Sequence, residues 1–214
     1  KQTEKIGFAN YKFIQCRFVD DNNEPQKNLI EYIYNRLFLQ GAQLIIVEAA
    51  AGFGKTSVSY ELIKKLADEP QGTIPIITEL SKNRTASIFR YVLLSEIDSK
   101  FSGLNSELVT YEIKQGRIPL IIDGFDELLS KSHDDVQQNL NDEDEKTAQT
   151  MLSTIAQLLD QNSKAKIVLT SRKSSIFAGD LFEKWSDKYL PSCQITRIQI
   201  IPPVASDWLD MAKI

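Results

Sequence analysis

Cysteine, histidine and long apolar runs are scarce in this sequence of 214 residues. The two cysteines, Cys16 and Cys193, form no C-x-x-C pair, and a chain of this length can bury a core without disulfides, so we expect a reducing, cytoplasmic setting. The single histidine, His133, stands in a polar segment, which predicts a solvated side chain rather than a zinc ligand. No apolar stretch approaches the roughly 18 residues that cross a bilayer, and the amino end lacks the apolar core of a signal peptide, so no membrane partner is expected.

An excess of positive charge is also lacking. Lys and Arg total 25 against 29 Asp and Glu, which gives a net charge of −4. This balance argues against a face dedicated to nucleic acid, so we do not expect nucleic acid as a partner of this domain. The composition, 42% hydrophobic and 25% charged, is typical of a soluble globular domain and excludes disordered and fibrous classes.

The sequence also has no initiator methionine and stops in mid-pattern at Ile214, so we expect it to be part of a longer protein. We expect three regions in it. An N-terminal arm and amphipathic helix occupy 1–41, a nucleotide-binding domain occupies 42–201, and the start of a truncated helical region occupies 202–214.

What is present is an alternation of apolar strands and amphipathic helices. Apolar runs predict strands over 44–47, 74–80, 118–122, 167–169 and 195–201. Helical spacing of apolar residues predicts helices over 25–40, 58–66, 86–101, 108–115 and 151–158, the fourth of them ended by Gly116. Residues 12–19 alternate and predict a short strand or an extended arm. This order predicts an α/β fold with a doubly wound parallel sheet, covered by helices on both faces.

A phosphate-binding loop follows the first apolar strand. Ala49 to Thr56 fits the pattern G-x-x-x-x-G-K-[ST] at every defined position except the first, where Ala49 replaces a glycine that often suits the backbone angles of that position. Successive N–H groups of such a loop wrap nucleotide phosphates at the start of the next helix. Lys55 would bridge the β- and γ-phosphates, and the Thr56 hydroxyl would bind Mg²⁺. The candidate nucleotide-binding residues are Ala49, Ala50, Ala51, Gly52, Phe53, Gly54, Lys55, Thr56 and Ser57.

A second motif ends another apolar strand in a carboxylate. Asp123 closes the run that begins at 118, which places it at the carboxyl edge of a parallel sheet, beside the phosphate loop. We expect Asp123 to hold Mg²⁺, through a water. Because Gly124 follows directly, the base that activates the attacking water must be Asp126 or Glu127, and Glu127 is the preferred candidate.

A third motif lies at the end of the strand over 167–169. The strand continues into Thr170, Ser171 and Arg172, which puts a cation at the same sheet edge. Arg172 is therefore a candidate for sensing or neutralising the γ-phosphate.

Together these motifs resemble the NACHT family of signal-transducing P-loop ATPases. The family's acidic motif is similar to the segment Leu120 to Glu127, its second strand to the segment 74–80 and its sensor strand to the segment 169–172, although Lys173 stands where the family often has Pro. The similarity runs from about 43 to 201.

The resemblance implies a five-stranded sheet in the order 5-1-4-3-2, with the sensor strand between the phosphate-loop strand and the acidic strand. It also implies a switch that holds ADP at rest, exchanges it for ATP, oligomerises, and signals in innate immunity or antiviral defence through sensor and effector regions outside this chain.

Three functions therefore stay open at this point. The leading one is a switch that binds ATP with Mg²⁺ and hydrolyses it slowly. The second is a motor-type ATPase that acts on nucleic acid or protein, and the third is a nucleotide-binding scaffold without hydrolysis. ATP is preferred over GTP because the sequence has no N-K-x-D segment for reading guanine.

Overall fold

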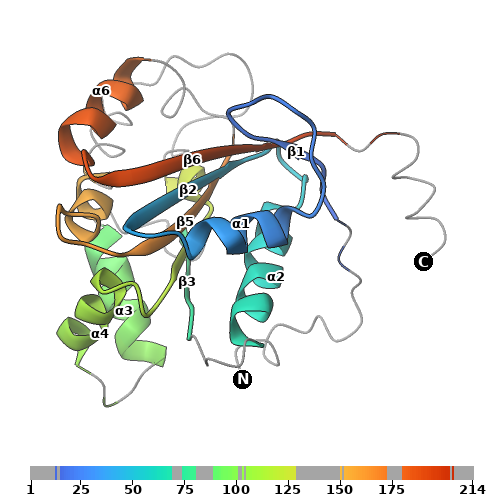
Figure 1. Cartoon of the computed structure of the whole chain (residues 1–214). Helices are drawn as coiled ribbons and strands as arrows, with labels where there is room; N and C mark the ends of the chain where they lie inside the picture. Colours follow the sequence, from blue (N-terminus) through green and yellow to red (C-terminus); the bar gives the residue numbers. More distant parts are fainter. Residues whose placement is uncertain are drawn as a thin grey trace.

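The protein forms one mixed β-sheet with helices on both faces (Figure 1). The structure is a computed structural model, and it describes residues 13, 15–68, 74–80, 89–100, 103, 105–128, 150, 152–172, 180–202 and 204. The strands are β1 (Phe18–Val19), β2 (Ala42–Glu48), β3 (Ile76–Glu79), β4 (Leu120–Asp123), β5 (Lys166–Ser171) and β6 (Cys193–Ile200). The helices are α1 (Leu29–Leu37), α2 (Lys55–Ala67), α3 (Phe89–Lys100), α4 (Ser106–Lys114), the 3₁₀ helix η3 (Phe125–Leu128), the helical residues 152–158, and α6 (Asp180–Tyr189).

The sheet has six strands in the order β1-β6-β2-β5-β4-β3, which corrects the predicted five-stranded parallel sheet. The additional strand is β1, which pairs antiparallel with β6 at the edge of the sheet, so that Phe18 lies opposite Ile200. It comes from the segment that the alternation over 12–19 indicated as a strand or arm. The five other strands run parallel to one another. Numbered from β2 as the first, they follow the order 5-1-4-3-2.

The register brings the carboxyl ends of these strands to one edge. Glu48, the last residue of β2, lies opposite Ser171, the last residue of β5. In the same way Glu79 at the end of β3 lies opposite Asp123 at the end of β4. The loops that follow β2, β4 and β5 therefore leave the sheet on the same side.

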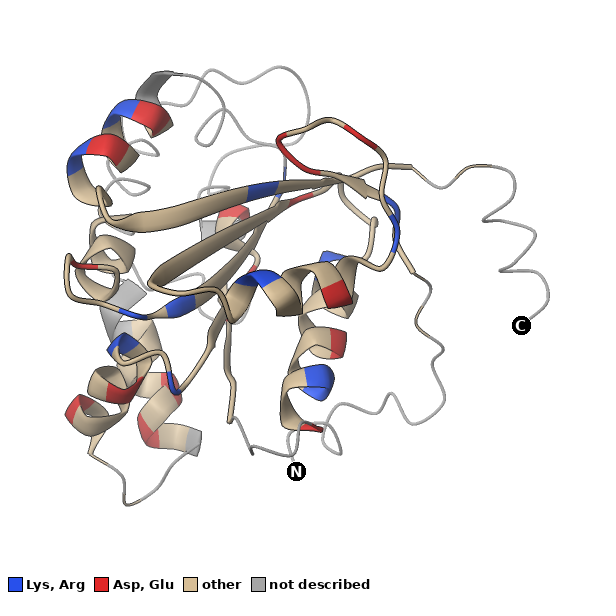
Figure 2. Cartoon of the chain, viewed as in Figure 1, with Lys and Arg blue, Asp and Glu red and all other residues tan. Residues whose placement is uncertain are grey.

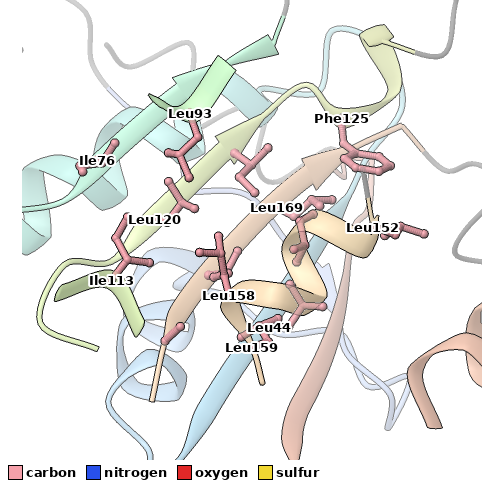
Figure 3. Packing of buried hydrophobic residues seen from close by; sticks show 14 of the residues in the cluster. Leu44, Ile76, Leu93, Ile113, Leu120, Phe125, Leu152, Leu158, Leu159 and Leu169 are labelled. Atoms are coloured by element: carbon pink, nitrogen blue, oxygen red, sulfur yellow. The ribbon is translucent and has the colours of Figure 1, made fainter. Parts of the chain in front are cut away.

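Two apolar clusters fill the two faces of the sheet. On one face α1 and α2 pack over alternate strand residues such as Ile45 and Val47. On the other face α3, α4, residues 152–158 and α6 pack over Leu44 and Ile46, and Figure 3 shows this second cluster. All seven residues of β2 are buried, because the strand lies between β6 and β5 and is covered on both sides. This explains why the centre of the strand, residues 44–47, is a continuous apolar run.

Helix α4 begins and ends at residues with a clear physical role. The side chain of Asn105 accepts a hydrogen bond of 2.7 Å from the backbone N–H of Glu107, which caps the first turn. After the helix, Gly116 has φ +73°, and a Cβ at this position would lie 2.3 Å from the backbone oxygen of Lys164. The prediction that Gly116 ends this helix is confirmed, and close approach of the chain at Lys164 explains the glycine.

Helix α6 was not predicted as an element. Its apolar residues Phe182 and Trp185 are three apart, their rings stack at a centroid distance of 5.7 Å, and both pack on the sheet beside Ile195. The spacing was therefore available in the sequence. The polar insertion over 130–146 with His133, the residue Lys173, and most of 202–214 lie outside the described residues.

Several of the described helices carry both signs of charge. Acidic and basic residues both occur on α2, α4 and α6 (Figure 2). Within the described ranges, no helix has the combination of length and apolar character that crossing a membrane requires.

Candidate functional site

The phosphate loop joins β2 to α2 at the carboxyl edge of the sheet. Two of its glycines have left-handed backbone angles, with φ +79° at Gly52 and +78° at Gly54. A side chain at either position would strain the backbone by about 1–2 kcal/mol. Gly54 is the N-cap of α2 and offers no side-chain acceptor to the first N–H groups of the helix. Such a helix start, open to solvent at Thr56, is suited to bind an anion.

Ala49 fits the loop without strain. Among the described residues, the non-glycine positions with positive φ are Asn23 and Asn28, so Ala49 does not need the freedom of a glycine. Its N–H donates to the backbone oxygen of Ser171 at 3.1 Å, and its side chain is buried. The departure from the consensus at this position is therefore compatible with the loop conformation.

Lys55 lies across the loop. Its Nζ donates to the backbone oxygens of Ala49 and Ala50 at 3.1 and 3.2 Å. These two bonds hold the ammonium against the loop, and the phosphates of a nucleotide would replace the carbonyl oxygens as its acceptors.

Asp123 accepts hydrogen bonds from three hydroxyl groups. Thr56 donates to its Oδ2 at 2.8 Å, and Ser59 and Thr170 donate to its Oδ1 at 2.9 and 2.6 Å. Asp123 is only 7% exposed, so these donors satisfy a carboxylate that has little water around it. The two predicted metal ligands, Thr56 and Asp123, are thus brought into contact.

The donor set is suitable for Mg²⁺. Thr56 supplies a hydroxyl oxygen and Asp123 a carboxylate oxygen 2.8 Å apart, and such hard oxygen donors are the ligands that Mg²⁺ prefers. In the described part of the chain, no group of three or more His, Cys, Asp or Glu residues could hold a metal by itself. The chemistry of Thr56 and Asp123 would fit a Mg²⁺ ion that is bound together with a nucleotide.

Gly124 and Phe125 direct the chain after Asp123. Gly124 has φ +79°, and its N–H donates to Oγ1 of Thr170 at 3.0 Å. This turn places Phe125, which is fully buried, in the apolar cluster near Leu152 (Figure 3). A glycine between the two acidic positions is therefore explained by the backbone angle that the turn requires.

The same turn brings Asp126 to the end of β5. Oδ1 of Asp126 accepts from the backbone N–H of Arg172 at 2.7 Å, and Oδ2 lies 3.0 Å from Nε of the same residue. The Asp126 side chain is 12% exposed and that of Arg172 is 58% exposed. The Asp126 carboxylate therefore joins the turn after β4 to the residue that follows β5. Glu127 belongs to η3, but its side chain lies outside the described residues.

A second carboxylate at this edge, Glu79, was missed at the sequence level. It ends β3 beside Asp123, and Tyr60 of α2 donates a hydrogen bond to its Oε1. Burial, followed by the negative charge of Asp123, raises the pKa of Tyr60, so its hydroxyl stays a donor. The available signal was that the predicted strand over 74–80 carries an acid near its end, as the strand before Asp123 does.

Comparison with known proteins shows a likeness in fold to a solved structure. No protein-family model matches the chain, and no curated protein is similar to it in sequence. Among solved structures, the ORC1 protein of Aeropyrum pernix in complex with DNA is 15% identical, with a TM-score of 0.50 over 86% of this chain and 46% of that chain. The fold is that of a P-loop NTPase. At this identity the likeness extends to the fold alone.

Two further solved structures are less similar. The Aeropyrum pernix ORC2 protein in its ADPNP-ADP complexes is 16% identical, with a TM-score of 0.47 over 86% of this chain and 49% of that chain. The E. coli MS115-1 HORMA:CdnC:Trip13 complex contains a chain that is 15% identical, with a TM-score of 0.46 over 81% of this chain and 54% of that chain. The present chain spans about half the length of these solved chains.

Proposed function

We propose that this chain is the nucleotide-binding core of an ATP-dependent switch of the NACHT type, which binds ATP or ADP with Mg²⁺ and hydrolyses ATP slowly. The observation that carries the proposal is the contact between Thr56 and Asp123 beside an uncapped helix start. It joins a phosphate loop to the carboxylate of a neighbouring strand, and this combination serves phosphoryl transfer.

Each residue of the site has a role in this proposal. The N–H groups from Ala50 to Ser57 bind the phosphates, and Lys55 moves from the loop carbonyls to the β- and γ-phosphates. Thr56 and Asp123 hold Mg²⁺, which when bound neutralises the charge that develops on the phosphate oxygens. Ser59 and Thr170 keep the Asp123 carboxylate oriented by their hydrogen bonds.

The contacts of Asp126 favour Glu127 as the base that deprotonates the attacking water. Both carboxylate oxygens of Asp126 are engaged by Arg172, one by the backbone N–H and one by Nε. A carboxylate whose two oxygens are both engaged by Arg172 is held at the end of β5 and is less available to contact a water. Asp126 is therefore a positioning residue that holds Arg172 at the sheet edge, and Glu127 is left to act on the water.

The NACHT type rests on the acidic motif, in which Gly124 separates Asp123 from the later acids. In such a protein the chain would belong to a larger innate-immune or antiviral defence protein. Its partners would be the sensor and effector regions and further copies of the protein in an activated oligomer. The signal that triggers exchange of ADP for ATP would act through those regions.

A second candidate is a AAA+-like ATPase that acts on nucleic acid or protein. The fold likeness to the Aeropyrum pernix ORC1 protein, whose structure was solved with DNA, supports it at least as well as the NACHT type. In this case nucleic acid would be a partner, although the net charge of −4 disfavours it.

Single-turnover hydrolysis of ATP by the full-length protein tests the proposed function. We expect slow loss of the γ-phosphate that Glu127→Gln abolishes and that duplex DNA leaves unchanged. Stimulation by DNA or by an unfolded polypeptide would support the motor-type ATPase instead. ATP binding without any hydrolysis would support the scaffold.

A further inference from the structure

The carboxyl edge of the sheet holds two neighbouring carboxylates that face the same helix. Glu79 and Asp123 are paired across β3 and β4, so their side chains leave the sheet on the same face. Helix α2 covers this face, and its hydroxyl groups donate hydrogen bonds to both carboxylates. Thr56 and Ser59 donate to Asp123, and Tyr60 donates to Glu79.

Two like charges at adjacent register positions repel each other unless something compensates them. Asp123 is buried and Glu79 is half-buried, so solvent screens this pair less than it would screen a surface pair. A divalent cation at Thr56 and Asp123 would bring positive charge to this pair. Mg²⁺ keeps several of its waters when proteins bind it, and those waters need acceptors.

We propose that Glu79 is the second carboxylate of the Mg²⁺ site and accepts hydrogen bonds from the water molecules of an Mg²⁺ ion held by Thr56 and Asp123. Tyr60 fixes the Glu79 carboxylate by donating to Oε1. Tyr60 follows Thr56 by one helical turn, so the same helix positions a metal ligand and the residue that orients the outer carboxylate. This inference rests on the proposed nucleotide site.

The test is the Mg²⁺ concentration needed for tight binding of a fluorescent ADP analogue, measured with the full-length protein. We expect Glu79→Gln to raise the concentration for half-maximal binding by about tenfold, as loss of an outer acceptor does at other metal sites. Binding of the analogue in EDTA should be unchanged. Tyr60→Phe should also raise the Mg²⁺ concentration for half-maximal binding, by a smaller factor. If Glu79→Gln does not fold, Tyr60→Phe alone tests the inference.

Glu61→Gln is the matched control. It removes the same charge from α2, but Glu61 lines a hollow of about 470 Å³ between α1 and α2 rather than the sheet edge. It should leave the Mg²⁺ dependence unchanged. An unchanged Mg²⁺ dependence in Glu79→Gln would overturn the inference, and so would an equal loss of binding with Mg²⁺ and with EDTA. Absence of nucleotide binding by the unmodified protein would instead refute the proposed function.

Discussion

Asp126 and Arg172, which are 46 positions apart in the sequence, are joined by two contacts at the edge of the sheet. The carboxylate accepts from the backbone N–H of Arg172 at 2.7 Å and lies 3.0 Å from its Nε. The pair connects the turn after β4 to the end of β5. It therefore determines where the guanidinium of Arg172 can reach.

This pairing predicts that Asp126 and Arg172 act as a unit in ATP hydrolysis. We expect Asp126→Asn and Arg172→Ala each to slow single-turnover hydrolysis by about 10²-fold, because each misplaces a group that stabilises the transition state. The double variant should be no slower than either single variant. Nucleotide affinity, measured in parallel, should change little. Additive effects of the two substitutions would instead show that Asp126 and Arg172 act independently.

Restoring the consensus glycine at position 49 should not improve binding. Ala49 does not have a positive φ, and its N–H already donates to Ser171. We therefore expect Ala49→Gly to leave ATP affinity within about twofold and to lower the free energy of unfolding by about 0.4–1 kcal/mol, because glycine gains more freedom in the unfolded chain. Isothermal titration and urea unfolding measure the two quantities. A large gain in affinity would mean that the loop is strained at this residue.

Removing the Thr170 hydroxyl should weaken both the fold and the metal site. Thr170 donates to Asp123 and accepts from the N–H of Gly124, and it is fully buried. Thr170→Val keeps the shape but leaves the N–H of Gly124 without this acceptor and removes one of the three donors to Asp123, so we expect a loss of about 1–3 kcal/mol in the free energy of unfolding. Thr110→Val is a suitable comparison, because its hydroxyl donates only to a backbone oxygen of its own helix. Equal losses in the two variants would argue against a special role of Thr170.

Cys193 should react slowly with alkylating reagents in the folded protein. Burial raises its pKa to about 12 from 9.0, so the thiol form dominates in the folded state. Because the pKa of Cys193 is higher in the folded than in the unfolded protein, the protonated thiol contributes to the stability of the fold below pH 9.0. This contribution is lost as the pH rises toward 12. Labelling with iodoacetamide at pH 8, with and without urea, checks this. Equally fast labelling in both conditions would contradict the burial.

Much of this site could be predicted from the sequence because its motifs are local. The loop from Ala49 to Thr56 and the strand that ends at Asp123 are each a continuous pattern, and a parallel sheet brings such strand ends to one edge. Asp126 and Arg172 were both expected there. Their direct contact was not, because it depends on the angle of the turn at Gly124.

The contributions of Ser59, Thr170 and Glu79 could not be predicted in the same way. Each depends on which residues of two elements lie opposite each other, and register between strands is set by the whole sheet. Strand β1 is only two residues long, so its antiparallel pairing with β6 leaves little signal in the sequence. The NACHT type and the activity stay predictions, because the likeness to solved structures extends to the fold alone.

ATP binding in the presence of Mg²⁺, compared between the unmodified protein, Lys55→Ala and Lys64→Ala, tests the central claim most directly. Lys55 lies across the phosphate loop, whereas Lys64 is exposed in the last turn of the same helix. We predict that Lys55→Ala binds ATP about 10- to 100-fold more weakly, because the variant loses hydrogen bonds to the charged phosphates. Lys64→Ala should bind ATP as the unmodified protein does. Equal affinity for ATP in the unmodified protein and in Lys55→Ala would contradict the proposed site.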